Sequence, residues 1–301
     1  MLLSILQIIG LQLVLPAAFI FSLWRIKSEN KLDWIIQLLF TVIYIMWIFL
    51  SGPWDWLGYY VRYVWVILLI PAVFFSWKKT RSLPLRTTLN GSQKITRGIH
   101  IVLILVFGLY NVSVFSSYTT QEEAIDLMFP LQDGTYYVGQ GGSSTQMNYH
   151  HAHEPQQYAL DIAKLNSFGS RASGIYPKDL DQFAIYGDTL YSPCTGEAME
   201  VRDGLPDLTP PEMNPEQPEG NYAALACEDT DAIVYIAHMQ ENSIMIQEGD
   251  TIQKGQPIGT VGNSGNTTEP HLHIHAEEEG VGIPIKFDDQ FLTRNDLVRT
   301  N

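Results

Sequence analysis

Four long apolar runs occupy the first 117 residues and constrain the fold more than any other feature of the chain. They lie at about residues 3–24, 34–51, 57–77 and 98–117. Each run is close to the ~20 residues that a helix needs to cross a bilayer. Aromatic residues of the kind enriched at membrane–water interfaces stand near the run ends: Trp24, Trp34, Trp54, Trp56, Tyr59, Tyr60 and Trp77. The sequence therefore predicts an N-terminal all-α membrane domain of four transmembrane helices, residues 1–117.

The alternative interpretation of the first run is a cleaved signal peptide. It lacks a basic segment before the apolar residues, and it continues well past the small residues Pro16, Ala17 and Ala18. Both features are atypical of a signal peptide. We therefore expect a retained span.

The loops between the runs differ in positive charge and predict an orientation. Residues 25–31 carry three Lys or Arg, residues 78–97 carry six, and residues 51–58 carry none. By the positive-inside rule, the first and third loops face the cytoplasm, so both termini lie outside the cell membrane. Arg62 and His100 fall near span ends, where long polar side chains reach the interface. We expect the spans to anchor the chain in the lipid bilayer, with a sensing or partner-binding role as the alternative.

The charge balance changes sign after the fourth run. Residues 1–117 hold ten Lys and Arg against three Asp and Glu, a net charge of +7, and residues 118–301 hold eight against 29, a net charge of −21. The second half is long enough for its own core. Its acidity argues against a nucleic-acid partner, which requires a basic face.

The second half has the patterns of a β protein. Short segments with strand character occur at 133–145, 157–165, 196–201 and 231–239, and residues 243–265 alternate strand segments with glycine turns. Residues 203–221 contain five prolines, so we expect a long surface loop there. The sequence predicts a mostly antiparallel β domain, residues 118–301, delivered to the extracytoplasmic face. The only two cysteines, Cys194 and Cys227, favour a disulfide in that setting, and neither belongs to a CxxC metal motif.

Three of the eight histidines fall in the segment PHLHIHAE, residues 270–277. Alternate residues of a strand share a face, so His271, His273 and His275 should point one way, with Leu272 and Ile274 packed inward. One strand cannot supply three tetrahedral zinc ligands, so other ligands must come from elsewhere. Candidates are His150, His151 and His153 before a strand that carries Asp161, and His238 at the end of another strand. An ordinary hydrogen-bonded imidazole is the alternative for each histidine taken alone.

Other catalytic signatures are absent from the sequence. There is no HExxH, because Pro155, Gln156 and Gln157 follow His153 and Glu154, and there is no GxSxG, P-loop or dinucleotide-binding motif.

Residues 237–277, AHMQENSIMIQEGDTIQKGQPIGTVGNSGNTTEPHLHIHAE, resemble the C-terminal core of the lysostaphin-type zinc endopeptidases, which cut peptide bonds in bacterial peptidoglycan. The upstream segment NYHHAHEPQQYALDI resembles the His…Asp element of the same family in a longer-looped version. The resemblance covers about residues 134–290.

The resemblance implies a role for each matching residue. Asp161 and His273 would bind Zn²⁺, and His271 and His238 would be catalytic. The family spacing puts the remaining ligand four residues before the aspartate, where this chain has Gln157. The Asn-x-His pattern points instead to His150, with His151 second and His153 third, and Asn148 would support that loop. His275 lies beyond the matching motif, so we expect it to support the site or line a groove.

The resemblance also implies a function. We expect a zinc-dependent endopeptidase that hydrolyses peptides of bacterial peptidoglycan from the outer face of the cell membrane. The alternatives are a non-catalytic member that binds the wall or regulates another hydrolase, and a membrane sensor module; a membrane partner protein is unidentified.

Overall fold

The computed structural model describes residues 2–300 and divides the chain into two compact units. Unit 1 comprises Met1–Trp54 and Tyr60–Phe115, and unit 2 comprises Asp55–Tyr59 and Ser116–Asn301. Residues 57–59 lie at the start of the third apolar run of the sequence, yet the segment Asp55–Tyr59 belongs to unit 2. Each unit is described by itself below.

Within residues 2–300, unit 1 contains four helices long and apolar enough to cross a membrane, which confirms the four helices that the sequence predicts. The first span, Leu3–Trp24, is built from α1 (Leu2–Ile9), the π-helical turn η1 (Gly10–Val14) and α2 (Leu15–Trp24). The other three are α3 (Lys31–Ser51), α4 (Val61–Thr80) and α5 (Gly91–Ser116). Polar residues extend α3 and α5 at their starts and α4 at its end beyond the apolar runs, whereas α4 begins at Val61, inside the run 57–77.

Local hydrogen bonds fix where the helices begin. The Asn30 side chain accepts a hydrogen bond from the Asp33 main-chain N–H at 3.0 Å and so caps α3. At α5, Asn90 and Gln93 form a reciprocal pair: each side-chain oxygen accepts from the other residue's main-chain N–H, at 2.9 and 3.0 Å. Inside the unit, the Tyr44 hydroxyl donates to the Leu11 carbonyl at 2.8 Å. Such contacts between helices are a main source of association in lipid.

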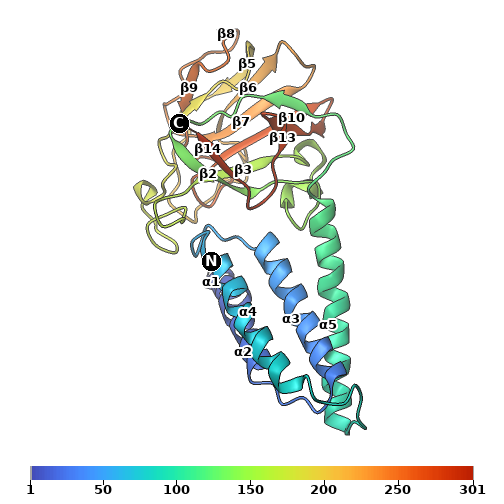
Figure 1. The fold of residues 1–301 in the computed structure, drawn as a ribbon. Coiled ribbons are helices and arrows are strands. Elements are labelled where there is room, and N and C mark those ends of the chain that lie inside the picture. The colour runs from blue at the N-terminus through green and yellow to red at the C-terminus, as the bar shows by residue number, and fades with distance from the viewer. Residues whose placement is uncertain (1, 301) are drawn as a thin grey trace. The chain divides into compact units, whose positions relative to one another are not determined.

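Unit 2 is built mainly from antiparallel β-sheet, as predicted. The largest sheet has nine strands in the order β14-β2-β3-β10-β7-β6-β5-β8, with β11 paired to β10 (Figure 1). A three-stranded sheet β1-β12-β13 contains the parallel pair β1–β12, and β4 pairs with β9. The strands are β1 (Ile125–Leu127), β2 (Gly134–Gln140), β3 (Leu160–Lys164), β4 (Thr189–Tyr191), β5 (Gly196–Arg202), β6 (Asn221–Cys227), β7 (Ile233–Met239), β8 (Thr251–Ile252), β9 (Pro257–Thr260), β10 (Leu272–Glu278), β11 (Val281–Ile283), β12 (Ile285–Phe287), β13 (Gln290–Phe291) and β14 (Leu297–Thr300).

The two faces of the large sheet differ in chemistry because side chains alternate along each strand. Leu272 and Ile274 of β10 are fully buried in the main core of unit 2, as the alternation predicts. Opposite them, His273 of β10 stands beside Asp161 of β3 in the strand register. The sheet therefore puts a carboxylate and an imidazole side by side on its second face.

The proline-rich segment forms the connection between β5 and β6. Its main chain pairs with the loop after β9: Leu208 N–H donates to the Asn263 carbonyl at 3.1 Å, and Asn214 N–H donates to the Gly265 carbonyl at 2.8 Å. The segment is thus packed along the loop that precedes β10. A disulfide joins Cys194 to Cys227, across the turn that enters β5 and the end of β6.

Candidate metal centre and active site

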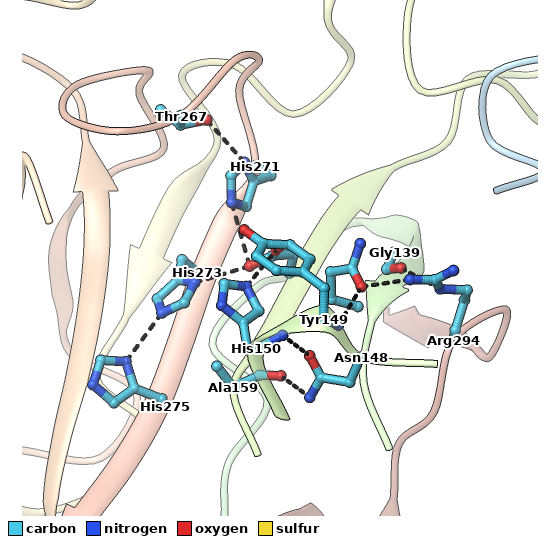
Figure 2. Close-up of polar contacts among 12 residues, drawn as sticks. Gly139, Asn148, Tyr149, His150, Ala159, Thr267, His271, His273, His275 and Arg294 are labelled. Atoms are coloured by element: carbon cyan, nitrogen blue, oxygen red, sulfur yellow. Dashed lines mark hydrogen bonds and ion pairs between the residues drawn. The ribbon is translucent and has the colours of Figure 1, made fainter. Parts of the chain in front are cut away.

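Asp161, on β3, is the centre of the candidate site. Its Oδ2 lies 2.9 Å from His150 Nε2, and its Oδ1 lies 2.8 Å from His273 Nδ1. His271 Nε2 is 3.4 Å from the same Oδ1. Figure 2 shows the rings of these three histidines converging. One carboxylate is therefore shared by three imidazoles from two separate parts of the sequence, the turn that carries His150 and the segment that carries His271 and His273.

The surroundings of Asp161 favour its ionised form. Burial alone would raise its pKa, but the facing imidazoles of His150 and His271 hold the pKa well below its usual range. Burial lowers the pKa of His273 despite its contact with the carboxylate. Within residues 2–300 Asp161 forms ion pairs with histidines and with no Lys or Arg. A buried carboxylate beside imidazole nitrogens is a suitable donor set for a cation.

His150 is brought to Asp161 by a short 3₁₀ turn, η2 (Tyr149–Ala152), which Asn148 caps. The Asn148 Oδ1 accepts from the His150 main-chain N–H at 3.2 Å, and its Nδ2 donates to the Ala159 carbonyl at 2.9 Å (Figure 2). Asn148 thereby ties the turn to the residue before β3. The Tyr149 ring also packs on the His150 ring, with centroids 4.1 Å apart.

The other candidate histidines of this segment lie differently. His151 Nδ1 is 3.1 Å from the Gln157 carbonyl oxygen, so its ring is engaged with the main chain. His153 does not belong to either metal-compatible group found in residues 2–300. Gln157, which occupies the position of the family's usual ligand, donates through Nε2 to the Gly282 carbonyl at 3.2 Å. His151 and Gln157 are therefore both engaged with main-chain carbonyls.

His238 and His271 form a second group beside the first. His238, His271 and His273 each offer a ligand atom within 4.8 Å of the others, as do His150, Asp161 and His273. The His238 and His271 rings have centroids 5.0 Å apart. His273 belongs to both groups, so the five side chains form one continuous site.

Main-chain carbonyls fix the proton position on both of these histidines. His238 Nδ1 is 2.9 Å from the Ser264 carbonyl oxygen, and His271 Nδ1 is 2.9 Å from the Glu269 carbonyl oxygen. A carbonyl oxygen only accepts, so each Nδ1 carries the hydrogen. The Nε2 atom of each ring is left to accept or donate a proton.

His238 holds its place through an unusual backbone. It is the penultimate residue of β7 and has a φ of 58°, in the left-handed region that residues other than glycine rarely adopt. Its main-chain N–H donates to the Glu219 carbonyl at 2.9 Å, and its carbonyl accepts from Gly262 N–H at 3.0 Å. Strain of this kind gathers at functional sites. Burial, followed by the neighbouring His271 and His273, lowers the pKa of His238 well below its usual value.

The pKa of His271 is shifted in the opposite direction. Burial would lower its pKa, but the carboxylate of Asp161 outweighs burial and raises it. The two neighbouring rings therefore differ in their affinity for a proton, which suits a site that needs one proton donor and one acceptor.

The site opens into a cavity of about 310 Å³. Its walls include His150, His238 and His273 from the site, together with Tyr149 and Glu219. Glu219 comes from the proline-rich segment, so this segment builds one wall of the cavity.

Sequence reasoning missed a buried ion pair that involves Glu269, in the loop before β10. Arg171 is 2% exposed, and its Nη2 lies 2.6 Å from Glu269 Oε2. Asp55 Oδ2 is 3.7 Å from Arg171 Nε, and the Trp56 ring lies 3.9 Å from the guanidinium carbon. No sequence pattern links these residues, because 98 positions separate Arg171 from Glu269. The pair matters to the site because the Glu269 carbonyl is the partner of His271.

Comparison with known families identifies much of this region. The model of peptidase family M23 matches residues 181–284, about a third of the chain. The chain carries an M23 peptidase domain. The matched residues include His238, His271 and His273, whereas His150 and Asp161 precede them.

Solved structures with a similar arrangement include M23 peptidases. A zinc-containing peptidase from Vibrio cholerae is 19% identical over 42% of this chain and 48% of that chain, with a TM-score of 0.27. The catalytic domain of lysostaphin from Staphylococcus simulans is 23% identical over 35% of this chain and 75% of that domain, with a TM-score of 0.22. The alignment thus spans about half of the Vibrio cholerae protein.

Proposed function

We propose that the chain is a zinc-dependent endopeptidase that hydrolyses peptide bonds of bacterial peptidoglycan at the outer face of the cell membrane. The proposal rests on one observation: His273 belongs to two neighbouring groups of side chains that could bind a metal. His150, Asp161 and His273 form a three-donor cluster, and His238 and His271 lie beside it with their Nδ1 atoms bound to main-chain carbonyls. A non-catalytic member would be expected to lack one of these five side chains.

The donor set fits zinc. Imidazole nitrogen and carboxylate oxygen are common zinc ligands, and three protein ligands leave a position for water in catalytic sites. Here His150, Asp161 and His273 would hold the ion. Bound zinc supplies a water of lowered pKa and polarises the scissile carbonyl.

His238 and His271 would move the protons. Each ring is fixed by its Nδ1–H to a main-chain carbonyl, so its Nε2 faces the reacting groups in a set orientation. One Nε2 takes a proton from the attacking water, and the other delivers a proton to the leaving amine or stabilises the oxyanion. The neighbouring Asp161 would favour the protonated state of His271.

The location of the site follows from the loop charges. With the basic loops at residues 25–31 and 78–97 in the cytoplasm, the M23 domain lies outside, where peptidoglycan is found. A reporter fused after residue 301 should give an external signal. A cytoplasmic signal would contradict the proposal, because it would place the domain on the side of the membrane that has no peptidoglycan.

The proposal is tested by digestion of purified peptidoglycan with the full chain in detergent. We expect new amino termini to appear, to stop when a chelator removes zinc, and to return when zinc is added back. His271→Ala should abolish release while zinc remains bound. Intact walls after incubation with the zinc-loaded wild type would contradict the proposal.

A further inference from the structure

His275 is a buried histidine that none of the proposed catalytic steps uses. It is 4% exposed and lies on β10, two residues after His273. Its ring stacks on the ring of Tyr235, its register partner on β7, with centroids 4.8 Å apart and an interplanar angle of 5°. The stack fixes the plane of the imidazole ring.

The fixed ring is in contact with His273. His275 Nδ1 lies 3.0 Å from His273 Nε2 (Figure 2). The other nitrogen of His273, Nδ1, is the atom that faces Asp161 Oδ1 at 2.8 Å. The two nitrogens of His273 therefore have different partners, one in the three-donor cluster and one outside it.

This arrangement determines what His275 can do for a bound cation. A nitrogen that binds a metal must present a lone pair, so a His273 that binds through Nδ1 carries its hydrogen on Nε2. That N–H is buried and needs an acceptor. His275 Nδ1 is the atom within hydrogen-bonding distance.

We propose that His275 is a positioning residue for the metal centre: it accepts the Nε2–H of His273 and so fixes the tautomer and ring angle in which His273 Nδ1 binds zinc. The inference rests on the proposed function, because it requires His273 to be a ligand. Histidine ligands usually donate their second N–H to a carboxylate, carbonyl or water, and loss of that partner weakens metal binding. Here the acceptor is a second imidazole, held by Tyr235.

The test compares zinc affinity of full-length variants in detergent, by competition with a chelating dye. His275→Phe keeps an aromatic ring on Tyr235 but removes the acceptor, and we expect it to weaken zinc binding about 10–100-fold. His275→Gln restores an acceptor oxygen and should recover most of the affinity. His153→Phe, which removes another histidine from the same cavity wall, should leave the affinity unchanged. If His275→Phe fails to fold without metal, His275→Leu serves the same comparison.

Cobalt(II) in place of zinc gives a second readout. Its visible absorption reports ligand geometry, so the spectrum should change in His275→Phe and return toward wild type in His275→Gln. Equal zinc affinity in His275→Phe and wild type would overturn the inference alone. Equal losses in the Phe and Gln variants would overturn it too, because the ring would then matter only for packing. A folded wild type that binds no zinc would overturn the proposed function as well.

Discussion

His150 Nε2 lies 2.9 Å from Asp161 Oδ2, although 11 positions separate the two residues. The link depends on the 3₁₀ turn that Asn148 caps, which directs His150 toward β3 while His151 bonds to the Gln157 carbonyl. The adjacent histidines therefore allow a matched test of which one completes the metal centre.

We expect His150→Ala to lose zinc binding and His151→Ala to retain it. Only His150 belongs to the three-donor group with Asp161 and His273. Metal content of the two purified full-length variants checks the prediction, with wild type as the reference. Retention of zinc by His150→Ala, or its loss only in His151→Ala, would reassign the ligand.

His238→Ala and His271→Ala should separate chemistry from metal binding. Each Nε2 is proposed to transfer a proton, so each change should lower the rate constant about 10²–10⁴-fold. Zinc content should stay at the wild-type level, because the three-donor group of His150, Asp161 and His273 is intact. The rates are measured on purified peptidoglycan. A variant that lost zinc together with activity would show its histidine to be a ligand.

Arg171→Ala should destabilise unit 2 by about 3 kcal/mol. The change leaves the Glu269 carboxylate without the guanidinium that binds it, and loss of one partner of a buried pair is strongly destabilising. Lys164→Ala removes a partly exposed ion pair with Asp188 and should cost about 1 kcal/mol or less. Denaturant unfolding, followed by hydrogen exchange in β10, compares the two variants. Equal effects would show that burial of the Arg171 pair is of no consequence.

Asp55→Asn should change the pH dependence of unit 2 stability. Burial raises the pKa of Asp55 to about 6 in spite of the nearby Arg171. Because the folded pKa lies above the unfolded one, the aspartate's favourable contribution is complete below pH ~4 and is lost as pH rises through about 6. Asparagine stays neutral at every pH. As the pH rises through this window, the free energy of unfolding of Asp55→Asn should therefore increase relative to that of wild type, by up to about 3 kcal/mol.

The check is denaturant unfolding of both full-length proteins at several pH values between 4 and 8. A stability difference that stays constant across this range would contradict the raised pKa of Asp55.

Much of the fold could be predicted because its signals are local. Apolar length alone revealed the four helices, and the alternation in HLHIH placed Leu272 and Ile274 in the core. The parallel pairing of β1 with β12 could not be predicted, because it joins residues 125–127 to 285–287 through tertiary packing. The placement of Asp55–Tyr59 in unit 2 has the same cause.

The candidate site likewise has features that could be predicted from the sequence and features that could not. Strand period predicted a shared face for His271, His273 and His275, and the family resemblance singled out Asp161 and His238. The sequence left the choice among His150, His151 and His153 open, because it depends on the conformation of a turn. The contact between His273 and His275 could not be predicted from the sequence either, because the plane of the His275 ring is set by stacking on Tyr235 in another strand.

The central claim, that His150, Asp161 and His273 hold one zinc ion, is tested most directly by elemental analysis of the purified full-length chain. We predict about one zinc per chain in the wild type and almost none in Asp161→Ala, in line with three protein ligands in a catalytic zinc site. A well-folded wild type without zinc, or an Asp161→Ala variant that binds zinc as fully as wild type, would contradict the claim.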